Sequence, residues 1–223
     1  MLNGFPRILI IRFSAIGDVV RTLPALHALR DAFPHAQIDW AIEKKSQDII
    51  LDHPALDAIH VFERPEGFKK GVRAFLQFCK TLRANRYDVV LDFHGIFKSG
   101  FASRATRARE RYAFAPPRGR ELSYLLANHR VRLPSAMLNR VEENLLLCEA
   151  AGAPPGATDF FIALPEETEE AIDAYVQNEF QSAKRIIAIH APVDRPEKQW
   201  PLARYAELAD MLLSDGRFEV LLT

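Results

Sequence analysis

The chain has 223 residues, 48% of them hydrophobic and 26% charged, which is ordinary for a globular protein and allows one large domain or one domain and part of another. Its 29 basic residues equal its 29 acidic residues, so the overall charge favours neither nucleic acid nor a membrane surface as a partner. The two cysteines, Cys79 and Cys148, have no metal-ligand spacing, and we expect both to be reduced core residues of a cytoplasmic protein.

The chain opens on a strand–turn–helix pattern. Residues 8–11 form a short continuous apolar run, which predicts a strand covered on both faces. Apolar residues spaced three or four apart from Val19 to Leu29 then predict one helix that begins at Asp18. The further predicted strands are 37–42, 58–62, 88–93, 111–114, 160–164, 185–190 and 218–222. The further predicted helices are 46–51, 72–83, 101–106, 139–150, 166–180 and 202–213. This alternation predicts a doubly wound α/β fold with a parallel sheet.

The segment 152–158 is the richest in glycine and proline and predicts a linker. We therefore expect an N-terminal domain at 1–164, and a linker helix with the start of a second domain at 165–223. The second domain begins a new strand–loop–helix–strand series and stops after two strands, which bury too little to stand alone. We expect either a fragment of a longer protein or a tail that packs onto the first domain or a partner.

Asp18 follows Gly17 at the carboxyl end of the first strand, where open α/β sheets bind ligands. One interpretation of Asp18 is a helix N-cap. The other is a general base, because a carboxylate at a helix N-terminus is stabilised in its ionised form and Gly17 would let a substrate approach. The two roles can coexist. The turn matches neither the dinucleotide-binding nor the P-loop glycine pattern, so it does not indicate NAD or ATP.

Basic residues gather in and beside three predicted loops. They are Arg64, Lys69, Lys70 and Arg73 around the loop 63–71, Lys98 after the strand 88–93, and Arg118 and Arg120 in the loop 116–120. Each alone can be a solvated surface residue, but together they favour an anionic ligand. Without long basic runs or interleaved aromatic residues, the pattern argues against nucleic acid.

A last polar segment, from His190 to Pro201, lies between a predicted strand and a predicted helix. Lys198 could contact a phosphate there as a point charge. His190 is better explained as a packed or hydrogen-bonded residue than as a catalyst. The sequence offers no Ser-His-Asp set and no metal-ligand set.

Taken together, these motifs resemble glycosyltransferase family 9, the lipopolysaccharide heptosyltransferases. The resemblance covers nearly the whole chain and is carried by IIRFSAIGDVVRTLPALHALRDAFPHAQIDWAIE, YDVVLDFHGIFKSG, RGRELSYLLANHRV and HAPVDRPEKQWP. The strand IDWAIE, the loop HGIFKSG and the pair Arg120-Glu121 favour the heptosyltransferase I branch.

The resemblance implies a GT-B fold, in which a Rossmann-like N-terminal domain holds a Kdo–lipid A acceptor and a second Rossmann-like domain holds ADP-heptose. It implies an inverting glycosyltransferase of lipopolysaccharide biosynthesis, cytoplasmic, without metal or other cofactor, and in peripheral contact with the inner membrane. Asp18 then resembles the base that deprotonates the acceptor hydroxyl, and Gly17 shapes its loop. The implied acceptor-binding residues are Lys69, Lys70, Arg73, Lys98 and Arg120. The implied nucleotide-sugar-binding residues are Lys198, Ala191 and Pro192.

Two departures from the family pattern bear on function. Pro192 and Val193 stand where the heptosyltransferase I pattern has hydroxyl residues, which removes candidate phosphate donors and leaves a different sugar donor open. The later nucleotide-sugar motifs of the family would lie beyond Thr223, so we expect little or no transfer by these residues alone. A non-catalytic binding module therefore remains an alternative.

Overall fold

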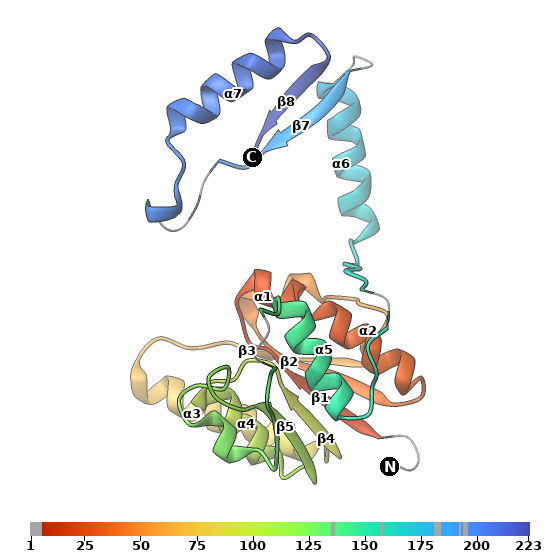
Figure 1. Cartoon of the computed structure of the whole chain (residues 1–223), viewed down its shortest axis with the longest axis vertical. Coiled ribbons are helices and arrows are strands. Elements are labelled where there is room, and N and C mark those ends of the chain that lie inside the picture. Colours follow the sequence, from red (N-terminus) through yellow and green to blue (C-terminus); the bar gives the residue numbers. More distant parts are fainter. Residues whose placement is uncertain (1–5, 135–136, 157, 181–183, 192, 194–195) are drawn as a thin grey trace. The chain divides into compact units, whose positions relative to one another are not determined.

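The computed structural model of the chain describes residues 6–134, 137–156, 158–180, 184–191, 193 and 196–223. The chain falls into two compact units, Met1–Ala163 and Leu164–Thr223 (Figure 1).

The first unit is built on a six-stranded parallel sheet with the strand order β3-β2-β1-β4-β5-β6. The strands are β1 (Arg7–Ile11), β2 (Gln37–Glu43), β3 (Ala58–Phe62), β4 (Val89–Asp92), β5 (Glu110–Phe114) and β6 (His129–Val131). The order reverses between β1 and β4, and doubly wound sheets bind their ligands in the crevice beyond the carboxyl ends of such a strand pair. The predicted α/β class and parallel sheet are confirmed.

Helices cover both faces of this sheet (Figure 1). On one face lie α1 (Ile16–Val20), α2 (Leu23–Ala32) and α5 (Arg140–Ala150); on the other lie α3 (Phe68–Ala84) and α4 (Phe97–Thr106). Two short 3₁₀ turns, η1 (Lys44–Ile49) and η2 (Ser123–Leu126), complete the unit. Successive side chains of β1 alternate between the two cores: Ile8 and Ile10 pack with α2, whereas Leu9 and Ile11 pack with α3. A strand covered on both sides needs this continuous apolar run.

The helix predicted to begin at Asp18 is two helices, α1 and α2, interrupted at Arg21 and Thr22. Pro24 lacks the N–H that would bond to the carbonyl of Val20, so the hydrogen-bond ladder cannot continue through it. Asn144 of α5 holds the break in place, because its Nδ2 donates to the carbonyl of Arg21 at 2.9 Å. The predicted single helix was therefore wrong.

Two helices on the other face begin earlier than predicted. Helix α3 begins at Phe68 rather than residue 72, and α4 begins at Phe97 rather than residue 101. The glycines Gly71 and Gly100 favoured loops in the sequence, but both lie inside helices here. Lys69, Lys70 and Lys98 therefore belong to first helical turns and not to loops.

The C-terminal part of the first unit also differs from expectation. The short strand β6 was not predicted, and the strand predicted at 160–164 is wrong, since that segment has no regular structure. Its Phe161 packs edge-on against the ring of His53, with 5.5 Å between ring centroids. Side-chain packing rather than strand pairing thus anchors this segment.

The second unit is small. It comprises α6 (Glu166–Glu179), β7 (Arg185–Ile189), the 3₁₀ turn η3 (Pro196–Lys198), α7 (Leu202–Ser214) and β8 (Phe218–Leu222). Strands β7 and β8 pair in parallel. Among the hydrophobic residues described in this unit, Ile189 alone is buried, so its core is slight.

Candidate functional site

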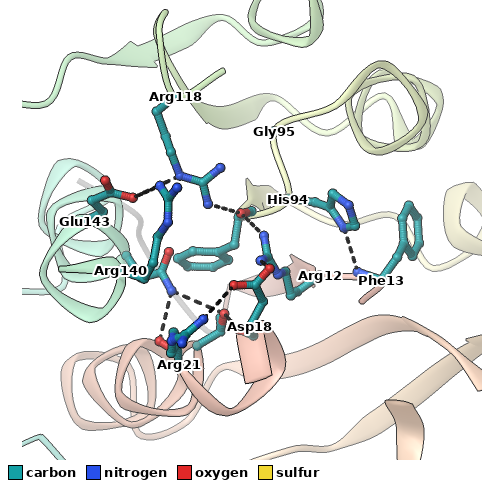
Figure 2. Close-up of polar contacts among 12 residues, drawn as sticks. Arg12, Phe13, Asp18, Arg21, His94, Gly95, Arg118, Arg140 and Glu143 are labelled. Atoms are coloured by element: carbon teal, nitrogen blue, oxygen red, sulfur yellow. Dashed lines mark hydrogen bonds and ion pairs between the residues drawn. The ribbon is translucent and has the colours of Figure 1, made fainter. Parts of the chain in front are cut away.

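Asp18 lies in the first turn of α1, just beyond the carboxyl end of β1 (Figure 2). The N-cap of this helix is Ala15, and no side chain caps it. The capping interpretation of Asp18 is therefore wrong, because the helix begins two residues earlier, at Ile16. The Asp18 carboxylate instead forms ion pairs with Arg12 and Arg21.

These two arginines hold the carboxylate very differently. Arg12 pairs with Oδ2, has only 6% of its side chain exposed, and donates from Nη1 to the Phe93 carbonyl at 2.7 Å. Burial lowers the pKa of Arg12 to about 10, which still leaves the guanidinium charged at neutral pH. Arg21 contacts Oδ1 at 3.3 Å, and 54% of its side chain is exposed. Among the described residues, one carboxylate oxygen is thus fixed by a buried cation, and the other contacts an exposed one.

Asp92 and His94, at the carboxyl end of β4, shape the neighbouring loop. Asp92 is buried and accepts hydrogen bonds from the backbone N–H groups of His94 (3.0 Å) and Gly95 (3.1 Å) and from Ser99 Oγ (2.9 Å). Burial raises the pKa of Asp92 to about 6, against the opposing effect of these hydrogen bonds. The loop that follows β4 is therefore tied down by a carboxyl group with no exposure to solvent.

His94 faces the loop that follows β1 (Figure 2). Its Nδ1 accepts a hydrogen bond from the backbone N–H of Phe13 at 3.2 Å. Burial, with the nearby charge of Arg12, lowers the pKa of His94 to about 4. The imidazole is therefore neutral at neutral pH and carries its proton on Nε2. It links the ends of β1 and β4 across the point where the strand order reverses.

A second cationic group comes from the loop after β5 and the start of α5. Arg118 donates from Nη2 to the Phe93 carbonyl at 3.3 Å and from Nε to Glu143 at 3.0 Å. Arg140 contacts the same Glu143 oxygen at 2.5 Å. Arg120 is exposed and shares with these two arginines a pocket of about 720 Å³. Glu143 compensates part of this charge, and the remaining positive charge suits an anion.

Lys98 is held firmly rather than extended into solvent. Its Nζ lies 2.7 Å from Glu43 Oε1 and over the rings of Phe62 (4.3 Å) and Phe13 (5.0 Å). Burial works to raise the pKa of Glu43, but Lys98 and Lys45 outweigh it and lower that pKa. Glu43, Lys98 and His94 line a pocket of about 630 Å³ at the carboxyl ends of β1, β2 and β4.

The other predicted acceptor-binding residues lie apart from this pocket. Lys69, Lys70 and Arg73 are exposed on the first two turns of α3. Gly17 lies inside α1, and a Cβ built there would meet only the Arg21 side chain, at 4.0 Å. The turn does not require glycine for its conformation, and the space beside Gly17 is open.

The predicted nucleotide-sugar residues belong to the second unit. Lys198 is exposed at the end of η3, and the Ala191 carbonyl accepts a hydrogen bond from Gln199 Nε2 at 2.9 Å. The same amide side chain accepts from the backbone N–H of Val193 at 3.3 Å, so it braces the loop. Pro192 lies outside the described residues.

The described part of the chain offers no group of three or more His, Cys, Asp or Glu side chains that could hold a metal ion. Both cysteines are buried and free. Burial raises the pKa of the Cys79 thiol to about 11 and raises that of Cys148 as well, which fits the predicted core role. No helix within the described ranges is long and apolar enough to cross a membrane.

Sequence reasoning missed several residues that hold the loops of the candidate site in place. These are Arg12, Glu43, Asp92 and His94, together with Glu143. A signal for the first four existed, because each stands at or directly after the end of a predicted strand, and the carboxyl ends of neighbouring parallel strands meet at one edge. Nothing local marks Glu143, which α5 brings back from far along the chain.

Comparison with known proteins gives consistent results. Residues 75–223 match the family model described as glycosyltransferase family 9 (heptosyltransferase). The lipopolysaccharide core heptosyltransferase OpsX of Haemophilus influenzae is 23% identical over 91% of this chain and 55% of its own length. Lipopolysaccharide heptosyltransferase 1 of Salmonella typhimurium is 29% identical over 94% of this chain and 66% of its own length. The chain thus spans between about half and two thirds of these curated relatives.

Solved structures share the fold. A family 9 glycosyltransferase from Veillonella parvula superposes with a TM-score of 0.85 and 21% identity, covering 100% of this chain and 63% of its own. The Escherichia coli heptosyltransferase WaaC with ADP gives a TM-score of 0.72 and 24% identity, covering 97% of this chain and 66% of its own. These likenesses confirm the predicted GT-B-like fold class. Because the family model matches well over half of its residues, the chain belongs to glycosyltransferase family 9, the heptosyltransferase family.

Proposed function

We propose that this chain is the acceptor-binding part, with the start of the donor-binding part, of an inverting heptosyltransferase of lipopolysaccharide biosynthesis. The enzyme would transfer a heptose from ADP-heptose to the Kdo–lipid A inner core. The observation that carries the proposal is the Asp18 carboxylate, held on one oxygen by buried Arg12 at the ligand edge of a family 9 sheet. Curated relatives that match most of this chain include lipopolysaccharide heptosyltransferases of type 1.

In the proposed reaction Asp18 accepts the proton of the acceptor hydroxyl. The hydroxyl oxygen forms a bond to the anomeric carbon of the heptose while the bond from that carbon to the diphosphate oxygen breaks, and ADP leaves with the electron pair. Attack from the face opposite the leaving group inverts the anomeric centre. Oδ1 suits the role of proton acceptor, because its partner in the part of the chain that the structure describes is the exposed side chain of Arg21.

The acceptor of this proposal is a polyanion, and basic side chains would bind it. Arg120, which shares its pocket with Arg118 and Arg140, would take one anionic group. Lys98 contributes within the pocket that contains His94, and Lys69, Lys70 and Arg73 would bind from the exposed turns of α3. Since Lys98 is already paired with Glu43, we expect it to contribute less binding free energy than Arg120.

For the donor, we propose that Lys198 and the loop at Ala191 and Pro192 contact the nucleotide sugar. Charge from basic side chains would stabilise the diphosphate leaving group, without a metal cofactor. Val193, where a hydroxyl residue was expected, favours as a second candidate a family 9 transferase that uses another sugar nucleotide. Release of nucleoside diphosphate across a panel of donors distinguishes the two candidates.

The decisive experiment is Asp18→Asn in the full product of the gene that contains this chain. Loss of a positioned general base should lower turnover by about 10²- to 10⁴-fold while ADP-heptose binding is retained. Asp31→Asn, an exposed substitution in α2, is the matched control and should keep full turnover. Near-normal heptose transfer by Asp18→Asn would disprove the proposed base. Because the proposed acceptor is a membrane lipid, we also expect the enzyme to make peripheral contact with the cytoplasmic face of the inner membrane.

A further inference from the structure

Helices α3 and α4 lie side by side on one face of the sheet, and together they are strongly basic (Figure 1). Neither helix contains an acidic residue. Their cations are Lys69, Lys70, Arg73, Lys80 and Arg83 in α3, and Lys98 and Arg104 in α4. In a chain whose basic and acidic residues are equal in number, this is a marked segregation of charge onto one face.

A groove of about 780 Å³ runs between the two helices, and we call it the basic groove. Its floor is apolar and includes Val72, Leu76 and Phe101. Its rim carries cations and no acidic residue: Lys69, Arg73, Lys80, Arg83, Arg104 and Arg107. Along α3 the rim runs from Lys69 to Arg83, a distance of about 21 Å at the rise of an α-helix.

Large apolar side chains are exposed at the N-terminal end of the same face. Phe68 is 81% exposed and Phe97 is 53% exposed. With Phe75 and Leu76 they line a second hollow of about 590 Å³, which adjoins the basic groove because both contain Phe68 and Leu76. A contiguous apolar strip on a soluble protein usually marks a surface that something covers.

We propose that the basic groove and its exposed phenylalanines dock onto an anionic lipid bilayer. Lys and Arg at the rim match the negative charge of phospholipid headgroups, and aromatic and aliphatic side chains between them can enter the acyl boundary. This proposal rests on the proposed function, because a transferase that acts on a lipid acceptor must reach the bilayer.

The aliphatic part of the strip favours a bilayer over nucleic acid. Phe68 and Phe97 can stack on bases as well as enter a bilayer, but Val72 and Leu76, four residues apart on α3 and 45% exposed each, offer a polynucleotide neither a stacking platform nor a hydrogen bond. A second copy of the chain is the other rival, since α6 carries six acidic residues and no basic one. Each rival predicts a different outcome in the test below.

The test uses the full chain and sedimentation with vesicles of phosphatidylcholine alone or with 30 mol% phosphatidylglycerol, both free of lipid A and sugar nucleotide. We expect binding only to the anionic vesicles, weakened by salt. Each rim cation contributes about fivefold to vesicle affinity, so the triple variant Lys80→Gln/Arg83→Gln/Arg104→Gln should bind about 100-fold more weakly. Phe68→Ser should weaken binding at all salt concentrations, because the apolar contact is not screened.

The matched control is Arg130→Gln/Arg132→Gln/Arg185→Gln, which removes three exposed cations outside the groove and should keep vesicle affinity within about threefold. Equal loss in both triple variants would mean that overall charge and not this face binds, and would overturn the proposal. Tighter binding to poly(U) than to vesicles would also overturn it, and so would salt-sensitive self-association without vesicle binding. The vesicle experiment does not measure heptose transfer. A negative result would therefore contradict the docking surface and leave the proposed role of Asp18 to its own test.

Discussion

Asp92 and His94 stand two residues apart at the end of β4, and burial shifts their pKa values in opposite directions. Asp92, with its pKa raised to about 6, favours its protonated form in the fold, so its contribution to stability is present below about pH 4 and is lost as the pH rises to 6. His94, with its pKa lowered to about 4, contributes stability above about pH 6.5 that is lost as the pH falls to 4. Between pH 4 and 6.5 the two contributions offset each other.

Single substitutions should therefore unmask the two contributions. In Asp92→Asn the amide oxygen can still accept from the backbone of His94 and Gly95, while Ser99 Oγ can donate to the Ile96 carbonyl instead. Relative to the parent, the unfolding free energy of this variant should rise by about 2–3 kcal/mol from pH 4 to 6.5. In His94→Asn the new amide oxygen can accept from the Phe13 N–H. Relative to the parent, the unfolding free energy of this variant should fall by a similar amount from pH 4 to 6.5.

Both variants and the parent are made in the Trp200→Phe chain, and their unfolding free energies are measured by urea titration at each pH. Trp40 is then the single tryptophan, and it is fully buried in the first unit. Trp40 also donates from Nε1 to the Arg12 carbonyl at 3.1 Å, so its fluorescence reports on the loop that contains the site. If the unfolding free energies of the two variants changed with pH in the same direction, burial would not set these two pKa values as described.

At the residue scale the sequence pointed to Asp18 but not to the residues that surround it. Asp18 stands out because it follows a glycine at a strand end. Arg12 is only a cation after an apolar run in the sequence, and its ion pair with Asp18 depends on the conformation of the loop between β1 and α1. For Lys98, the sequence suggested a cation that is available to a ligand, whereas the structure pairs it with Glu43, which is 55 residues away in sequence. Pairings between residues far apart in sequence carry no periodic signal.

Helix α4 contains a glycine for a reason that its sequence does not show. A Cβ on Gly100 would meet the backbone carbonyl oxygen of Ser123 at 2.9 Å, because η2 packs directly against this helix. Gly71 in α3 has no such neighbour, and its Cβ would meet Arg64 Nε at 3.8 Å. Two helical glycines thus occupy opposite environments, one closed by backbone and one open.

Alanine at these two positions should change stability with opposite signs. Gly100→Ala should lower the unfolding free energy by about 1–3 kcal/mol, because α4 or η2 must shift to admit the methyl group. Gly71→Ala should raise it by roughly 0.5–1 kcal/mol through helix propensity alone. Urea unfolding of both variants and the parent gives the comparison. A stabilised Gly100→Ala chain would mean that η2 yields easily and does not fix α4.

These glycines also explain which elements could be predicted. Strands β1 and β4 follow from apolar runs of strand length. The helix predicted at 139–150 is α5, which begins at Arg140 with Asn139 as its N-cap, and Asn139 Oδ1 accepts a hydrogen bond from the Val141 N–H at 2.9 Å. The starts of α3 and α4 were misplaced, because Gly71 and Gly100 indicate loops by local propensity, and only tertiary packing shows why helices tolerate them. Strand β6 is too short, at three residues, to leave a pattern.

For the molecule as a whole, the distribution of buried apolar residues is very uneven. The two hydrophobic cores on either face of the sheet consist of residues from the first unit, among them Ile8, Trp40 and Leu91 on one side and Leu9, Phe78 and Val90 on the other. In the described part of the second unit, Ile189 is the single buried hydrophobic residue. The site that contains Asp18 therefore depends on a core that lies entirely within residues 6–163.

Residues 1–163 should consequently fold without the second unit, whereas residues 164–223 should not fold alone. A parallel strand pair with two helices buries too little apolar surface to offset the conformational entropy of about 60 residues. Thermal unfolding followed by circular dichroism should give one cooperative transition for 1–163, within about 5 °C of the main transition of the full chain, because a loss of under 1 kcal/mol moves a domain of this size by only a few degrees. Residues 164–223 should show a gradual, non-cooperative change. A cooperative melt of 164–223 alone, or a 1–163 fragment without near-ultraviolet signal from Trp40, would contradict this account, since each would mean that stability is shared between the units rather than held in the first.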